Sequence, residues 1–95
     1  MVVGVCFLHL HIYESNSLKS KRHVLRQIID RTRNKFNVAI AEVGDNDRWQ
    51  SAQLGFCVVG NESGHVNSMV DKVYQFIDTM HAAEIYHSHW ELIHF

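Results

Sequence analysis

Two segments of the chain have the periodicity of amphipathic helices, and they constrain the fold more than any other feature. In residues 17–36 and again in residues 66–80, apolar side chains recur at helical spacing. Such side chains lie on one side of a helix. The first stripe is Leu18, Leu25, Ile28, Ile29, Thr32 and Phe36, and the second is Val66, Met69, Val70, Val73, Phe76, Ile77 and Met80. Each helix must therefore bury one face, and Ser17 is a suitable N-cap for the first.

Four strand-like segments accompany these helices, at residues 2–12, 37–43, 50–59 and 84–95. Successive side chains of a strand point to opposite faces of a sheet. In the first and third segments the even positions are the more apolar set, and we expect them to face the helices. They are Val2, Cys6, Leu8, Leu10 and Ile12, followed by Ala52, Leu54, Phe56 and Val58.

The order strand, helix, strand, strand, helix, strand predicts an α+β fold of the ferredoxin-like βαββαβ type, formed by residues 1–95 as one domain. Right-handed crossovers place both helices on one face of a four-stranded antiparallel sheet of order 4-1-3-2. The other sheet face stays uncovered, as a dimer interface or a ligand platform. We expect a homodimer, either through stacked open faces or through paired edge strands.

Composition indicates an ordinary globular protein, with 46% apolar and 20% charged residues and no proline. The apolar N-terminal segment has no basic region before it and is interrupted by His9 and His11, so we expect neither a leader nor a membrane span. A cytoplasmic protein is the default expectation. Cys6 and Cys57 are expected to be reduced thiols on opposite sheet faces, which argues against a disulfide.

Charge is concentrated in the first helical segment. Residues 17–36 contain seven of the nine Lys and Arg residues and one acid, Asp30, for a local net charge of +6. On a helical projection Lys19, Arg22, Arg26 and Arg33 form a narrow stripe beside the apolar face, with Lys21, Arg31 and Lys35 on the other flank. Any surface helix needs charges, but a merely solvated face usually mixes both signs. The pattern therefore predicts a polyanion-binding helix.

The segments SLKSKR (17–22) and NVAIAEVGDNDRWQSAQLGFCVVGNE (37–62) resemble the YlxP-like family of small bacterial proteins, a domain of unknown function. The resemblance covers nearly the whole chain. It implies a ferredoxin-like fold and a cytoplasmic bacterial protein whose genes often lie beside those for translation initiation and ribosome maturation factors. The recurring family positions are Ser17, Leu18, Lys19, Lys21, Arg22, Glu42, Asp47, Trp49 and Gly55. No catalytic residues are implied, and the histidine-rich ending is not part of the family pattern.

The charge pattern and the resemblance together predict RNA or a ribosomal subunit as the partner. The expected phosphate contacts are Lys19, Lys21, Arg22, Arg26 and Arg33, with Arg48 and Trp49 as further contributors. Base stacking on the sheet is not favoured, because residues 54–58 lack the basic residue and the second aromatic of the RNA-recognition motif. For Trp49 we favour a core position that closes the end of the sheet over an exposed stacking position.

The eight histidines predict a second, competing site. His9 and His11 share one face of the first strand, and His87 and His89 share one face of the last. Because those strands are neighbours in the expected sheet, four imidazoles are able to meet on the open face and bind Zn²⁺ or sense pH. Ordinary surface and interface histidines are the favoured interpretation, and we expect no resident cofactor.

No nucleophile–base spacing, Walker loop or dinucleotide fingerprint is present, so we expect a non-enzymatic protein. Residues 60–64 precede the second helix and fit either phosphate binding by free amides or plain helix capping. Three functions remain open at this point: an RNA- or ribosome-associated factor, a metal- or small-ligand-binding module using the histidine face, and a dimerisation or adaptor module.

Overall fold

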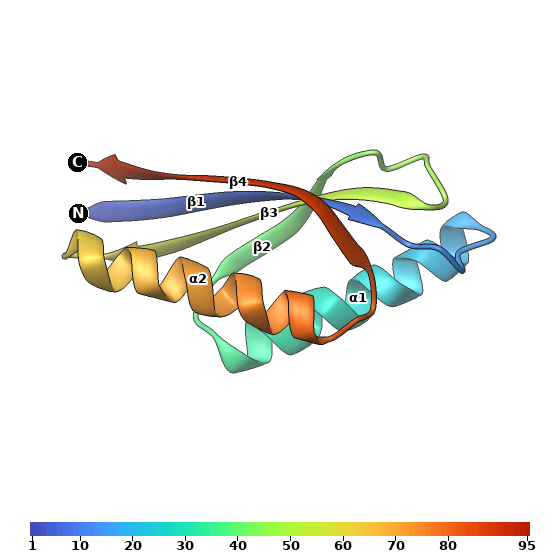
Figure 1. The fold of residues 1–95 in the computed structure, drawn as a ribbon, viewed down its shortest axis with the longest axis horizontal. Helices are drawn as coiled ribbons and strands as arrows, with labels where there is room; N and C mark the ends of the chain where they lie inside the picture. Colours follow the sequence, from blue (N-terminus) through green and yellow to red (C-terminus); the bar gives the residue numbers. More distant parts are fainter.

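The computed structural model describes residues 1–95 and contains all six predicted elements (Figure 1). They are β1 (Val2–His11), α1 (Leu18–Lys35), β2 (Ala39–Gly44), β3 (Ser51–Gly60), α2 (Ser63–Thr79) and β4 (Glu84–His94). Most boundaries lie within one or two residues of the prediction, the start of α2 being earlier than the first residue of its apolar stripe. Neither helix combines the length and the apolar character that crossing a bilayer requires.

The strands form one antiparallel sheet of order β2-β3-β1-β4. This is the order 4-1-3-2 read from the opposite edge. Both helices lie on the same side of the sheet, and the other side is uncovered (Figure 1). The architecture is therefore the predicted α+β, ferredoxin-like arrangement.

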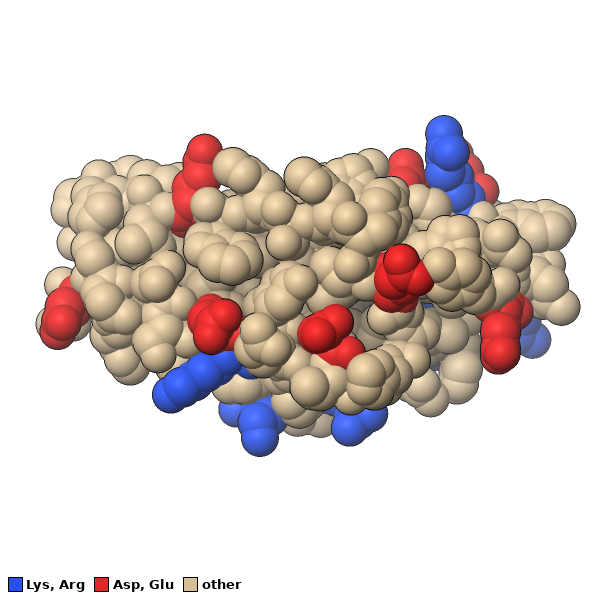
Figure 2. Space-filling model, viewed as in Figure 1, with Lys and Arg blue, Asp and Glu red and all other residues tan.

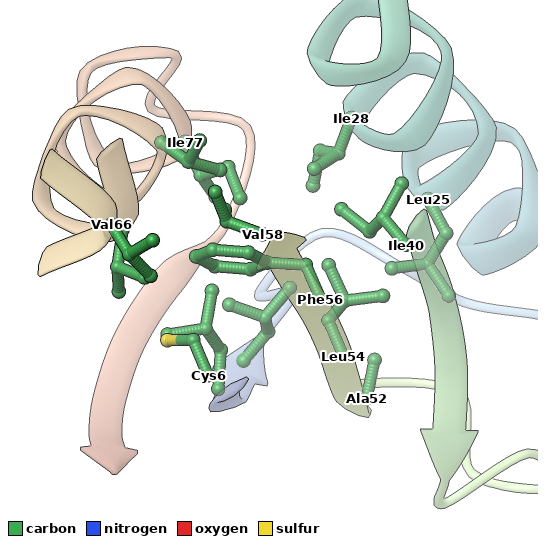
Figure 3. Close-up of a cluster of buried hydrophobic side chains, with 14 of the residues drawn as sticks. Cys6, Leu25, Ile28, Ile40, Ala52, Leu54, Phe56, Val58, Val66 and Ile77 are labelled. Atoms are coloured by element: carbon green, nitrogen blue, oxygen red, sulfur yellow. The ribbon is translucent and has the colours of Figure 1, made fainter. Parts of the chain in front are cut away.

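The core lies between the sheet and the helices, and its centre is the ring of Phe56 on β3 (Figure 3). In Figure 3, Val66 and Ile77 of α2 lie on one side of this ring and Ile28 of α1 lies on the other. The predicted even positions of β1 and β3 are all buried. Alternation along the strands thus separated the core face from the open face correctly.

Two glycines let α2 lie close to the sheet. A Cβ on Gly4 would come within 2.6 Å of the Val70 side chain and within 2.9 Å of Val66, and one on Gly60 would come within 2.7 Å of Val66. Such distances are shorter than van der Waals contact. Side chains at either position would therefore push α2 away from β1 and β3.

Helix α1 begins as its sequence predicts, with the Ser17 Oγ accepting a hydrogen bond from the Ser20 amide at 3.0 Å. It ends at Phe36, whose amide donates to the Thr32 carbonyl. The Phe36 ring meets Phe76 edge to face at 5.5 Å, which joins the C-terminal ends of the two helices. The helix is therefore held at both ends while its long outer face stays exposed.

Candidate nucleic-acid interface

Lys21 is the residue whose position differs most from the prediction, because it is buried in the core face of α1 with 0% exposure. Its ammonium lies 3.0 Å from the Glu42 carboxylate and donates to the carbonyls of Asp45 at 2.7 Å, Ser51 at 3.2 Å and Asn46 at 3.3 Å. An ammonium has three donors, and all are used inside the protein. Lys21 is therefore removed from the expected phosphate contacts.

The buried ammonium fixes the loop between β2 and β3 against α1. Asp45 has a left-handed backbone with φ of 59°, which aspartate tolerates better than most residues. The Ser51 hydroxyl donates to the Asp45 carboxylate at 2.6 Å, and this bond, assisted by Arg48, holds the pKa of Asp45 below its ordinary value. The Gln50 side chain ties the same loop to the carbonyls of Tyr13 and Ser15.

The predicted stripe of Lys19, Arg22, Arg26 and Arg33 is exposed along α1. None of the four has a salt bridge, and the one hydrogen bond among their side chains is from Arg33 to the Ile40 carbonyl at 3.2 Å. In Figure 2 most of the visible Lys and Arg atoms lie along the lower margin, where Figure 1 places the helices. The structure thus keeps these cations free of acidic partners.

A shallow groove of about 260 Å³ runs between α1 and β2 beside this stripe. Its lining includes Arg22, Arg26, Asp30 and Glu42. Because Glu42 is already paired with Lys21, Asp30 is the remaining free acid in the groove. The groove therefore joins the exposed arginines to the edge of the sheet.

Arg48 and Trp49 lie on the anchored loop, close to the start of α1. The Arg48 side chain is 75% exposed and lies 3.7 Å from the Asp45 carboxylate. Trp49 is 55% exposed, so the prediction of a core position for it is wrong. The indole lies outside the core because Trp49 belongs to the loop before β3, and pairing with β1 begins only at Gln50, whose carbonyl accepts a hydrogen bond from the Ile12 amide. An exposed indole beside an arginine is suited to stacking on a base.

The four histidines of the competing prediction share the open face without converging on one point. His9 and His87 are direct cross-strand neighbours, with ring centroids 5.3 Å apart. His11 instead stacks near Tyr13, and His89 lies 3.3 Å from Glu91. No group of three or more His, Cys, Asp or Glu side chains has the spacing of a metal site. These histidines therefore form a loose row along the face.

Most of the chain matches a known protein family. The family described as "Protein of unknown function (DUF503)" matches residues 3–90, which include every residue of the candidate interface. The chain belongs to this family. It is also 37% identical over 78 residues to "Uncharacterized protein YlxP" of Bacillus subtilis (strain 168), covering 82% of this chain and 85% of that protein.

Two features of this family member, the burial of Lys21 and a cavity, were not predicted from the sequence. Lys21 lies at i−4 and i−7 from Leu25 and Ile28, so helical spacing already placed it in line with the buried stripe. The second feature is a cavity of about 660 Å³ where β1, α1, α2 and β4 meet, whose lining includes His11, Glu14, Asp78, His81 and Glu84. At its rim the Tyr13 hydroxyl donates to Glu84, which raises the pKa of Tyr13. No sequence pattern marks this cavity, because its residues come from four separate segments.

Proposed function

We propose that this protein is a non-enzymatic RNA-binding factor that associates with a ribosomal subunit through the exposed basic stripe of α1. The observation that carries the proposal is the row of four exposed cations, Lys19, Arg22, Arg26 and Arg33, without an acidic partner. Unpaired cations on a surface are ready to neutralise phosphates and release counterions.

The shape of the stripe fits a nucleic-acid strand. At 1.5 Å per residue, the fourteen steps from Lys19 to Arg33 span about 21 Å of helix axis, which is long enough to reach several phosphates. Arg22 and Arg26 line the groove together with Glu42 of β2. Arginine has a planar donor fork that matches phosphate geometry. The stripe thus supplies phosphate contacts without sequence preference.

The anchored loop supports the proposal from a second element. Trp49 and Arg48 are exposed at the same end of α1 as Lys19 and Arg22, because Lys21 holds the loop there from beneath. An aromatic beside a row of cations is the usual combination in single-strand binding, where stacking contributes about 1–3 kcal/mol per base. We therefore assign phosphate binding to α1 and base stacking to the loop.

Because the net charge of the chain is −1, a polyanion is attracted to the basic stripe and not to the surface as a whole. Asp71 and Asp78 of α2 would repel a polyanion that approached from that helix. Ribosomal RNA is the polyanion we name, because the family resemblance implies genes beside translation factors.

The test is co-sedimentation with ribosomal subunits across a salt series, with a labelled single-stranded RNA measured in parallel. A Lys19→Ala, Arg22→Ala, Arg26→Ala triple variant is compared with Arg31→Ala, Lys35→Ala, Lys72→Ala, which removes the same charge elsewhere. We expect the first triple to abolish association and to lower the salt slope of RNA binding by about 2. The control triple should bind nearly as wild type.

Thermal unfolding of both triples separates binding from folding. Because the three stripe residues are exposed, we expect their removal to leave the melting temperature nearly unchanged. Equal loss of binding in the two triples, or no sedimentation of the wild type even at low salt, would overturn the proposal.

A further inference from the structure

The uncovered face of the sheet has no Lys or Arg. By strand register and alternation its residues are Val3, Val5, Phe7, His9, His11, Ala39, Ala41, Val43, Ser51, Gln53, Gly55, Cys57, Val59, Glu84, His87, His89, Glu91 and Ile93. Glu84, which lies opposite His11 at the end of the face, and Glu91 are the two charged residues among them. In Figure 2 the upper margin over the strands is tan apart from one acidic side chain, until the loop at the right.

This composition narrows the choice of partner. A polyanion or an anionic membrane surface needs cations, and the face has no Lys or Arg. Both carboxylates have partners within the chain, since His89 Nε2 lies 3.3 Å from Glu91 Oε1 and the Tyr13 hydroxyl donates to Glu84. Depletion of charged residues is instead the compositional mark of the centre of a protein–protein interface.

The face is also apolar enough and large enough for a dimer. Val5, Val43, Val59 and Ile93 are each between 38% and 61% exposed, and Phe7 lies among them on β1. Two strands of 10 residues, one of 11 and one of 6, at about 3.3 Å per residue and about 4.8 Å apart, give a flat area of about 600 Å². Stable interfaces bury roughly 800 Å² of accessible surface per partner. Because side chains protrude from the sheet, the accessible area of the face is larger than its flat area and comes close to that value.

We propose that the uncovered sheet face binds the same face of a second copy of this chain. An apolar surface with few charges is complementary to itself, whereas it offers a polyanion no cation to pair with. Two sheets stack in the dimer, and the helices of both copies lie on the outside. The inference is independent of the proposed RNA binding, because the basic stripe of α1 lies on the helix side and stays free.

The test is sedimentation equilibrium of the wild type, Val5→Lys and Asn67→Lys. Val5 is at the middle of the face, between Cys57 on β3 and Glu91 on β4. A lysine there meets Glu91 in the free monomer but must be desolvated in the dimer. Asn67 is exposed on α2, so its variant adds the same charge on the helix side. We expect a wild-type dimer, a monomeric Val5→Lys and a dimeric Asn67→Lys.

A second measurement needs no variant. Cys57 lies on the proposed interface and is partly exposed, while Cys6 is buried and its pKa is raised to about 11, so Cys57 is the reactive thiol at pH 7. We expect the rate constant for maleimide labelling of Cys57 to fall at least fivefold as the protein concentration rises from about 1 to about 200 μM, the range in which interfaces of modest size associate.

A wild type that stays monomeric over this range, with labelling independent of concentration, would overturn the proposal. A dimer that Val5→Lys leaves intact would also overturn it, because the interface would then lie elsewhere, such as the edge strands. If Val5→Lys fails to fold, the concentration dependence of Cys57 labelling in the wild type decides whether the open face is the dimer interface.

Discussion

Lys19 and Lys21 lie two residues apart on the same helix and have opposite surroundings. Lys19 extends into solvent, whereas the Lys21 ammonium is enclosed by Glu42 and the carbonyls of Asp45, Asn46 and Ser51. A charge taken out of water is tolerated only with such a full set of partners. At the scale of single residues, burial therefore separates a structural cation from one that is free to bind a ligand.

We expect Lys21→Met to lower the free energy of unfolding by about 3 kcal/mol, since it leaves buried carbonyls and the Glu42 carboxylate without their donor. Lys19→Met should change it by less than about 0.5 kcal/mol. Urea unfolding followed by circular dichroism measures both. Equal midpoints for the two variants would show that the ammonium does not hold the loop.

Burial raises the pKa of the Cys6 thiol to about 11 from an ordinary value of 9.0. Between these two pKa values the Cys6 thiol is protonated in the folded chain and ionised in the unfolded chain. The free energy of unfolding is therefore unaffected below about pH 9 and falls as the pH rises toward 11. The slope is at most about 1.4 kcal/mol per pH unit. Urea unfolding between pH 8 and pH 10.5 measures it, with Cys6→Ala as the control. Identical pH dependence in both chains would contradict the prediction.

At the scale of elements, the two helices differ in how they begin. The N-terminus of α1 is capped by the Ser17 hydroxyl, while Glu62, at the same position of α2, makes no side-chain capping bond. The longer glutamate side chain is a poor N-cap, and the shorter aspartate is among the best. Helix α2 is thus held mainly by its packing on the sheet through Val66, Val70 and Val73.

We expect Glu62→Asp to raise the free energy of unfolding by about 0.5–1 kcal/mol and Ser17→Ala to lower it by about 1 kcal/mol. Both changes are measured as shifts of the urea unfolding midpoint, with the slope of the unfolding free energy against urea concentration unchanged. If Glu62→Asp does not raise the free energy of unfolding, water already satisfies the free amides at the start of α2.

At the scale of the whole molecule, charge and apolar surface are divided between the two sides of the sheet. The helix side has the basic stripe, and the open side has an apolar face without Lys or Arg (Figures 1 and 2). A dimer through the open faces would be a four-layer assembly with sheets about 10 Å apart and a basic helix on each outer side. Such an assembly would present two phosphate-binding surfaces.

We therefore expect an RNA long enough to contact both stripes to bind the wild type about 10- to 100-fold more tightly than a short RNA. Val5→Lys should lose this difference while keeping the affinity for the short RNA. Fluorescence anisotropy with the two RNAs and both proteins measures it. A length preference that persists in a monomeric Val5→Lys would separate RNA binding from dimerisation.

The sequence by itself determined the six elements, the core faces of β1 and β3, the Ser17 cap and the stripe of Lys19, Arg22, Arg26 and Arg33. These follow from periodicity and capping, which are local properties of neighbouring residues. The partners of the Lys21 ammonium, the exposure of Trp49 and the scatter of the histidines were decided only by the tertiary structure. Helical spacing places Lys21 in line with the buried stripe, but the carbonyls that bind its ammonium lie 24 to 30 residues away, and a contact at that separation leaves no mark on local spacing.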